Sequence, residues 1–152
     1  IADAHTDECE HECNDIFYYA RLTNEMAENL ENIPYSEQPM RIGSYPMKLA
    51  EGSKLASLYK TLETSERHHH RRELNPAFQA ELSSAGLRFS GTSPDGLLIE
   101  AFELPGHPCY IGIISHPQFK SRPYRSHPLF DEFINQALVY RKKREKKKTA
   151  SG

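Results

Sequence analysis

The sequence predicts an α/β domain. Its 152 residues, 38% of them hydrophobic and 26% charged, fit one globular domain with a core of its own. Segments with strand propensity alternate along the chain with segments that carry helix-start and helix-stop residues. One such strand ends at His116-Pro117, where proline cannot continue a ladder of backbone hydrogen bonds. A ring that titrates near neutral pH at a strand end is either a functional group or a cap that bonds a backbone carbonyl.

In the first half of the chain, β-branched and aromatic residues mark the strands, and capping residues mark the helix starts. The expected elements are, in order, a strand at 16–22, a helix at 23–33 capped by Thr23, one or two strands at 39–50 broken at Gly43 and Pro46, and a helix at 54–62 capped by Ser53.

In the second half, "NPAFQAELSSAGL" predicts a helix, with Asn75 as cap, Pro76 at its first position and Gly86 as its stop. The turn sequence "TSPDG" between two apolar runs predicts a hairpin. The strand that leads to His116 follows. The last element is a helix from 127 onward with an amphipathic stripe, formed by Leu129, Phe130, Phe133, Ile134, Ala137 and Leu138.

Charge is distributed unevenly although the formal net charge is only −2. Residues 1–39 hold ten acidic residues and one arginine, whereas 141–148 hold seven basic residues and one acid. Runs of like charge are typical of solvated surface, so we expect no binding of nucleic acid or membranes. We expect a domain at 1–140 and a disordered basic tail at 141–152. Three cysteines, an odd number, favour a reducing compartment, and we expect the protein to be cytoplasmic.

Two segments raise the alternative of a metal site. "HTDECEHEC" places Cys9 and Cys13 one helical turn apart, but its spacing matches no standard zinc pattern. "RHHHRR" at 67–72 fits a strand, in which we interpret His68 to His70 as structural. We therefore expect no metal site.

Several motifs together resemble one family. "SERHHHRRELN", "GTSPDGLLIEAFELPGHP" and "SHPQFKSRP" occur in this order, and "PMRIGSYPMKLAEGSK" and "ADAHTDE" precede them. They resemble the glutaminase domain of CTP synthases, which are class I glutamine amidotransferases. The resemblance covers residues 2–140 and is weakest over 9–38. It implies a flavodoxin-like sheet with flanking helices, of which this chain supplies the C-terminal half.

The resemblance also implies a reaction and its residues. Members of the family hydrolyse glutamine through a cysteine thioester and pass the ammonia to CTP synthesis from UTP. On this sequence His116 matches the catalytic base and Gln118 the position of the residue that orients it. Glu8 matches the acid that binds the α-amino group of L-glutamine, and Arg71 matches the arginine that binds its α-carboxylate. One carboxylate and one guanidinium suit a zwitterionic ligand.

Two departures from the family pattern matter. The orienting residue is glutamate in the family and Gln118 here, so it cannot stabilise an imidazolium by charge. The nucleophile turn, Gly-x-Cys-x-Gly, lies N-terminal to these motifs, and Cys9, Cys13 and Cys109 lack its glycines. The chain alone is therefore expected to be inactive. Either it is the C-terminal half of a larger glutaminase domain, or it is a pseudo-glutaminase that serves as a binding or regulatory module.

The resemblance implies partners beyond the substrate. They are the N-terminal half of the glutaminase domain and a synthetase domain, with a homo-oligomer for the full enzyme. No cofactor is implied in this chain, because ATP and Mg²⁺ belong to the synthetase domain.

Overall fold

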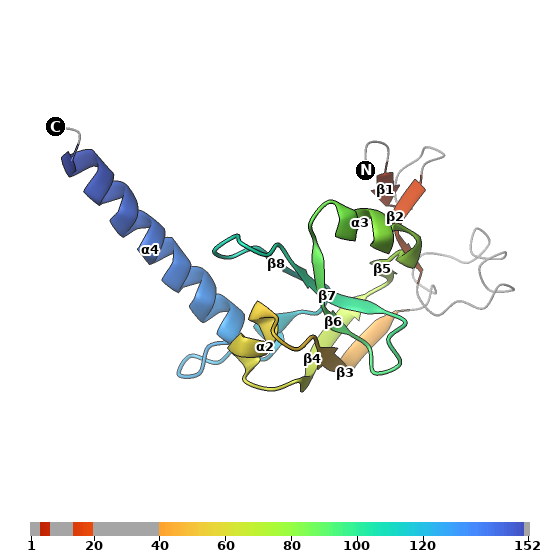
Figure 1. The fold of residues 1–152 in the computed structure, drawn as a ribbon. Helices are drawn as coiled ribbons and strands as arrows, with labels where there is room; N and C mark the ends of the chain where they lie inside the picture. The colour runs from red at the N-terminus through yellow and green to blue at the C-terminus, as the bar shows by residue number, and fades with distance from the viewer. Residues whose placement is uncertain (1–3, 7–13, 20–39, 151–152) are drawn as a thin grey trace, which may run out of the picture.

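The chain forms two β-sheets and a long C-terminal helix (Figure 1). The structure, a computed structural model, describes residues 4–6, 14–19 and 40–150. The helix expected at 23–33 and the substrate residue Glu8 expected from the resemblance lie outside these residues.

The smaller sheet has the strand order β1-β2-β5, in which β1 and β2 are parallel and β2 and β5 antiparallel. The larger sheet has the order β4-β3-β6-β7-β8, and all its pairings are antiparallel. A flavodoxin-like sheet is built from parallel strands. The described residues contain one parallel pair, β1 with β2, so the flavodoxin-like arrangement stays a prediction. The strands are β1 (Ala4–Thr6), β2 (Asn14–Tyr19), β3 (Arg41–Leu49), β4 (Glu63–His70), β5 (Arg72–Leu74), β6 (Arg88–Thr92), β7 (Ile99–Glu103) and β8 (Ile111–Ile113).

Strand β3 runs without the breaks expected at Gly43 and Pro46. It pairs with β4 along nearly its whole length but with β6 only at Lys48 and Leu49. At Pro46 one side of the strand therefore has no neighbour among the described strands, and the missing N–H breaks no ladder there. Gly43 adopts a φ of 102°, which a glycine permits within a continuous strand.

The capping residues act as the sequence predicts. The Ser53 side chain accepts a hydrogen bond of 3.0 Å from the Ala56 amide at the start of α2 (Lys54–Tyr59). Lys60 then adopts a left-handed conformation, which ends this helix before the expected position 62. Asn75 caps the 3₁₀-helix η3 (Pro76–Phe78), which continues into α3 (Gln79–Ser84).

The predicted hairpin is confirmed as β6 and β7, joined through "TSPDG". Within the turn, the Ser93 hydroxyl accepts a hydrogen bond of 2.9 Å from the Leu98 amide and contacts the Asp95 carboxylate. Gly96 has a φ of 77°, the left-handed conformation that glycine allows. The residues of this turn therefore predict the hairpin from the sequence alone.

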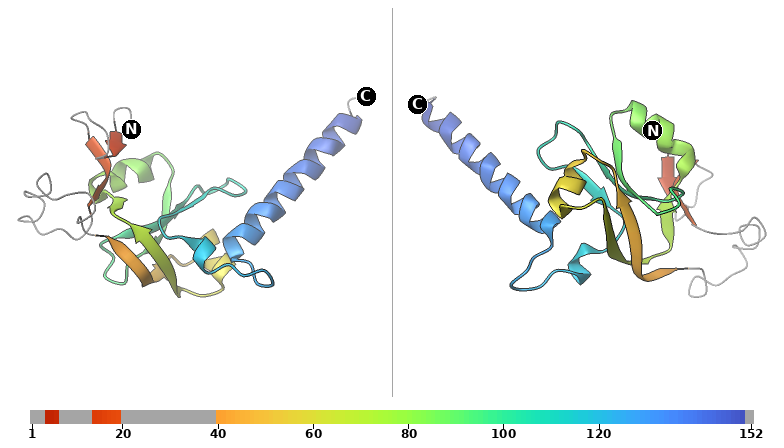
Figure 2. Two further views of the ribbon diagram at one scale, coloured as in Figure 1. Left: turned by 180° about the vertical axis from the view of Figure 1, so that it is seen from behind. Right: turned by 60° about the horizontal axis from the view of Figure 1, so that its bottom comes forward.

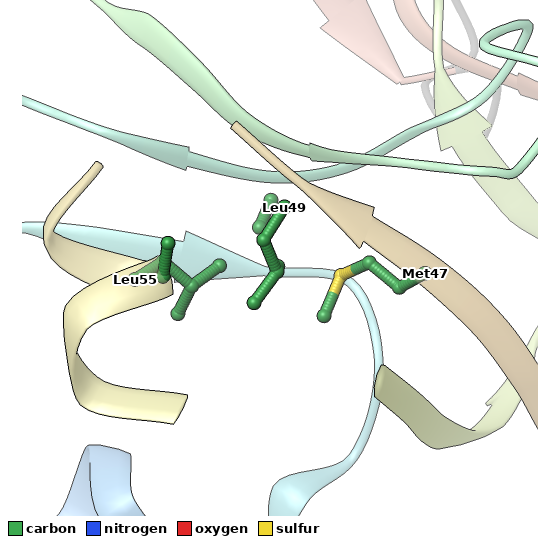
Figure 3. Packing of buried hydrophobic residues seen from close by; sticks show 5 residues of the cluster. Met47, Leu49 and Leu55 are labelled. Atoms are coloured by element: carbon green, nitrogen blue, oxygen red, sulfur yellow. The ribbon is translucent and has the colours of Figure 1, made fainter. Parts of the chain in front are cut away.

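A small apolar core lies between α2 and the larger sheet. Met47, Leu49 and Leu55 pack against one another there (Figure 3), and Ala56 and Ala101 complete the buried cluster. Leu129, from the first turn of the last helix, packs on its outside. This core fixes β3 and β7, the strands on which the site-bearing segments β4 and β8 pair.

The last helix, α4 (Pro128–Ala150), extends away from the sheets in every view (Figures 1 and 2). Its predicted stripe is largely exposed: Phe133 is 61% accessible and Ile134 56%. The basic end, expected to be disordered, is helical through Ala150. Lysine, arginine and glutamate are good helix formers, and Arg141 pairs with Glu145 one turn later. The domain boundary at 140 stays a prediction.

Candidate active site

His116 lies three residues beyond the end of β8 and not on the strand itself. It is the N-cap of a short 3₁₀-helix, η4 (Pro117–Phe119), whose first residue is the proline that was expected to end the strand. The His116 amide donates a hydrogen bond of 2.7 Å to the carbonyl of Arg67 on β4. This bond joins the end of the β8 segment to the opposite edge strand of the larger sheet. The side chain is half-buried.

Gln118 contacts the imidazole of His116. Its Nε2 lies 2.8 Å from His116 Nδ1. The amide therefore donates to Nδ1, which leaves the ring proton on Nε2. Turned over, the same amide would present its oxygen and accept from Nδ1–H, leaving Nε2 free to act as a base. A carboxylate can only accept, so a glutamate would select the second tautomer, whereas Gln118 supports both.

The outward side of β4 faces this histidine. The His69 ring meets the His116 ring edge to face, with centroids 6.5 Å apart, and Phe119 stacks on His116 at 5.4 Å. A hollow of about 270 Å³ lies beside them and is lined in part by Arg67, His69 and Phe119. His69 is thus the exposed histidine of β4, and it contacts the His116 ring.

The inward side of β4 belongs to a buried polar cluster. We call it the Arg41 cluster; its members are Arg41, His68, His70, Glu73 and Glu100. The Arg41 guanidinium binds Glu73 Oε1 at 2.6 Å and Glu100 Oε1 at 2.7 Å, and both carboxylates are about 1% exposed. His70 donates from Nδ1 to the Arg72 carbonyl at 2.8 Å, and its Nε2 lies 2.7 Å from His68 Nδ1.

Burial sets the protonation of this cluster. Desolvation, reinforced by the positive charge of Arg41, lowers the pKa of His68 to about 3 and that of His70 to about 4. Burial opposes the charge of Arg41, but hydrogen bonds to Glu100 and Glu73 outweigh it and raise its pKa. At neutral pH the cluster thus consists of an ion pair network with two uncharged imidazoles. These histidines are structural, as the sequence analysis proposed.

The acidic members of this cluster were not predicted from the sequence. Glu100 lies within the apolar run "LLIEAFEL", and a carboxylate in a strand that is otherwise buried signals a buried partner. The partner, Arg41, lies 59 positions away, so no local pattern reveals it.

Of the remaining residues considered for the site, the structure describes Arg71 and Cys109. Arg71 is the half-buried residue at the bend between β4 and β5, where the chain passes from one sheet to the other. Cys109 is a free, half-buried thiol in the loop before β8. Glu8, Cys9 and Cys13 lie outside the described residues.

An apolar groove adjoins the His116 turn. It has a volume of about 600 Å³, and Ile113, Pro117, Leu129 and Phe133 are among its lining residues. Within the part of the chain that the structure describes, β8 pairs with β7 alone, so one edge of this strand is also open.

Among the described residues, no group of three or more histidine, cysteine, aspartate or glutamate side chains is arranged to hold a metal ion. No helix in that part of the chain has the length and apolar character to span a membrane.

Comparison with known proteins identifies the fold and the family. The family described as "Glutamine amidotransferase class-I" matches residues 19–136. Among solved structures, the fold is similar to the glutaminase domain of Trypanosoma brucei CTPS with bound acivicin. The TM-score is 0.76 at 24% identity, over 91% of this chain and 52% of that chain. The chain therefore belongs to the class I glutamine amidotransferase family.

The relatives in sequence narrow this assignment. CTP synthase of Saccharopolyspora erythraea is 56% identical over 104 residues, which are 67% of this chain and 18% of that protein. CTP synthase of Pelotomaculum thermopropionicum is 53% identical over 105 residues, 69% of this chain and 20% of that protein. Within the family, the chain is thus similar to part of the glutaminase domain of CTP synthases. It spans about a fifth of the length of these relatives.

Proposed function

We propose that this chain supplies the histidine half of a glutaminase site that releases ammonia for CTP synthesis from UTP. The observation that carries the proposal is the geometry of His116. Its ring lies on the η4 turn, beside the hollow described above. Gln118 contacts its Nδ1, and the outward side of β4 lies next to the ring. In our proposal, Arg71 and Glu8 bind the α-carboxylate and the α-amino group of L-glutamine. ATP and Mg²⁺ belong to a separate synthetase domain, and we assign them no residue of this chain.

The proposed chemistry is nucleophilic catalysis. His116 Nε2 takes the proton of a cysteine thiol, and the thiolate attacks the γ-carboxamide carbon of glutamine. Ammonia leaves with the proton that the imidazolium returns, and a γ-glutamyl thioester remains. Water, deprotonated by His116, then hydrolyses the thioester to glutamate and restores the thiol.

The nucleophile comes from another segment in this proposal. Cys109 precedes β8 in a loop between Pro108 and Tyr110 and has no glycine neighbours, so it does not fit a nucleophile turn. The groove beside Pro117 supports a complementary half-domain as the partner, because it is apolar and lies next to an open strand edge. The full domain would then be the flavodoxin-like sheet of the family, to which the antiparallel strands described above add an extension. We place the activity in the cytoplasm and expect the full enzyme to be a homo-oligomer.

Gln118 decides how active the site is. With the amide oxygen toward Nδ1, the ring is oriented correctly but gains no charge stabilisation, so turnover should be low. In a protein that joins this chain to the rest of its amidotransferase domain, Gln118→Glu should raise kcat for ammonia release. An orienting carboxylate contributes up to about 10⁴-fold in the related serine triad.

The control for this experiment is Gln79→Glu, the same chemical change at an exposed position on α3. It should leave kcat unchanged. His116→Ala should abolish the activity of both the parent protein and the Gln118→Glu variant. If Gln118→Glu leaves ammonia release undetectable in a folded protein that contains a nucleophile cysteine, the glutaminase proposal fails.

That failure would favour the second candidate, a pseudo-glutaminase that acts as a binding or regulatory module. The observation in its favour is an amide at position 118, because an amide, unlike a carboxylate, can donate to Nδ1 and so permits the tautomer that cannot accept a thiol proton at Nε2.

The chain alone is expected to be catalytically silent. Purified and supplied with L-glutamine, the 152 residues should release no ammonia above the rate of a His116→Ala variant. An activity that His116→Ala removes would show that the nucleophile lies within this chain.

A further inference from the structure

Glu66 is a fully buried carboxylate on the inward side of β4 that belongs to no ion pair of the Arg41 cluster. Its Oε1 lies 3.0 Å from the Tyr59 hydroxyl, 3.1 Å from His127 Nε2 and 3.2 Å from Lys120 Nζ. We call these four residues the Glu66 cluster. They come from α2, β4, the end of η4 and the residue before α4.

The tautomer of His127 follows from its other contact. The Leu129 amide, at the start of α4, points at His127 Nδ1 at 3.3 Å. Nδ1 therefore accepts, and Nε2 carries the proton that is donated toward Glu66 Oε1. Lys120 brings its ammonium group to the same carboxylate oxygen.

Burial alone would raise the pKa of the Glu66 carboxyl, but the hydrogen bond from His127 and the charge of Lys120 outweigh burial and lower it. Glu66 is therefore ionised at neutral pH, and it pairs with the Lys120 ammonium group as well as the His127 ring. A buried carboxylate holds the ammonium group that pairs with it in place.

Lys120 is the residue that ends η4. Besides Glu66, its ammonium group donates to the carbonyl of Ser65. The other end of η4 is fixed by the His116 amide, which binds the Arg67 carbonyl. The short turn that presents His116 is thus attached to consecutive residues of β4 at both of its ends.

This attachment determines where the His116 ring points. The ring stacks on Phe119, within the same turn, and meets His69 on β4. A turn of three residues has little structure of its own, so its orientation depends on what holds its ends. We propose that Glu66 and Lys120 are positioning residues, which fix the η4 turn on β4 and so orient His116. Their relevance to catalysis rests on the glutaminase function proposed above.

Lys120→Met tests this inference in the full 152-residue chain. The Lys120 side chain is 36% exposed, so the substitution spares the core. Hydrogen exchange measured by NMR should show the His116 amide exchanging roughly tenfold faster or more, because a hydrogen bond to a charged group is lost. The ratio of the two His116 tautomers, read from the ring ¹⁵N shifts, should change with it. Lys120→Arg should restore both values, since arginine donates to the same two acceptors.

Lys48→Met is the matched control. Lys48 also donates to a backbone carbonyl, that of Pro94 at 2.7 Å, but it binds the β6–β7 turn. Lys48→Met should leave the exchange rate of the His116 amide within about twofold of the parent. The inference is overturned if Lys120→Met changes exchange no more than Lys48→Met, or if the tautomer ratio stays constant. Neither measurement uses glutamine, so a failure of this inference can be distinguished from a failure of the proposed function.

Discussion

The two sides of β4 differ in almost every physical property although they alternate along eight residues. On the inward side, Glu66 and His68 are buried and contact residues distant in sequence, Glu66 through His127 and His68 through Glu100. On the outward side, Arg67 and His69 are exposed, and His69 contacts the His116 ring. Side chains of successive residues point to opposite faces of a strand, so a run of similar polar residues is divided into two environments.

The charged residues of "SERHHHRR" therefore have two roles. Charges that are buried and paired fix the strand between its neighbours, and charges that are exposed remain available to a ligand. The inward side should therefore control stability, whereas the outward side should control binding and catalysis.

Arg41→Met should have the largest effect on stability. It removes the guanidinium that binds the buried Glu73 and Glu100 carboxylates, and breaking such a network costs about 3–5 kcal/mol. Chemical denaturation would give the free energy of unfolding. Arg141→Met is the control, because its ion pair with Glu145 on α4 is exposed and should contribute less than about 1 kcal/mol. Equal losses in the two variants would contradict the contrast.

Acid should destabilise the inward side next. His68 and His70 stay neutral in the folded chain down to pKa values of about 3 and 4, whereas both bind protons near pH 6.5 when unfolded. The unfolded chain thus binds more protons between pH 6.5 and 4, and the free energy of unfolding falls as pH falls through this window. The slope is at most about 1.4 kcal/mol per pH unit for each histidine.

His70→Gln should reduce this slope when thermal or chemical unfolding is measured at several pH values. His107→Gln, at an exposed histidine in the loop before β8, should leave the slope unchanged. A slope that does not depend on His70 would show that its burial has no energetic consequence.

The outward side should give the smallest change in stability. Arg67→Met and His69→Gln alter exposed side chains, and each should change the free energy of unfolding by less than about 0.5 kcal/mol. In a protein that joins this chain to the rest of its domain, the same variants should instead change KM or kcat for glutamine. A loss of stability as large as that of Arg41→Met would remove the distinction between the two sides.

The sequence predicted the elements where local chemistry decides them. Ser53 and Asn75 cap helices because their side chains reach an amide two or three residues ahead. The β6–β7 hairpin follows from its turn residues. The predictions failed elsewhere: β3 passes through Pro46, where no described strand pairs with its second side, and α2 ends early at Lys60.

The family could be recognised from the sequence, because its motifs are local runs of residues. The spacing of two residues also keeps Gln118 within reach of His116, whereas the catalytic role of this pair stays a prediction. The tertiary structure alone decided which charges are buried. Arg41, Glu73 and Glu100 meet across 32 and 59 positions, and Lys120 reaches Glu66 across 54. Burial and pairing at such separations depend on strand order and register, which no local pattern specifies.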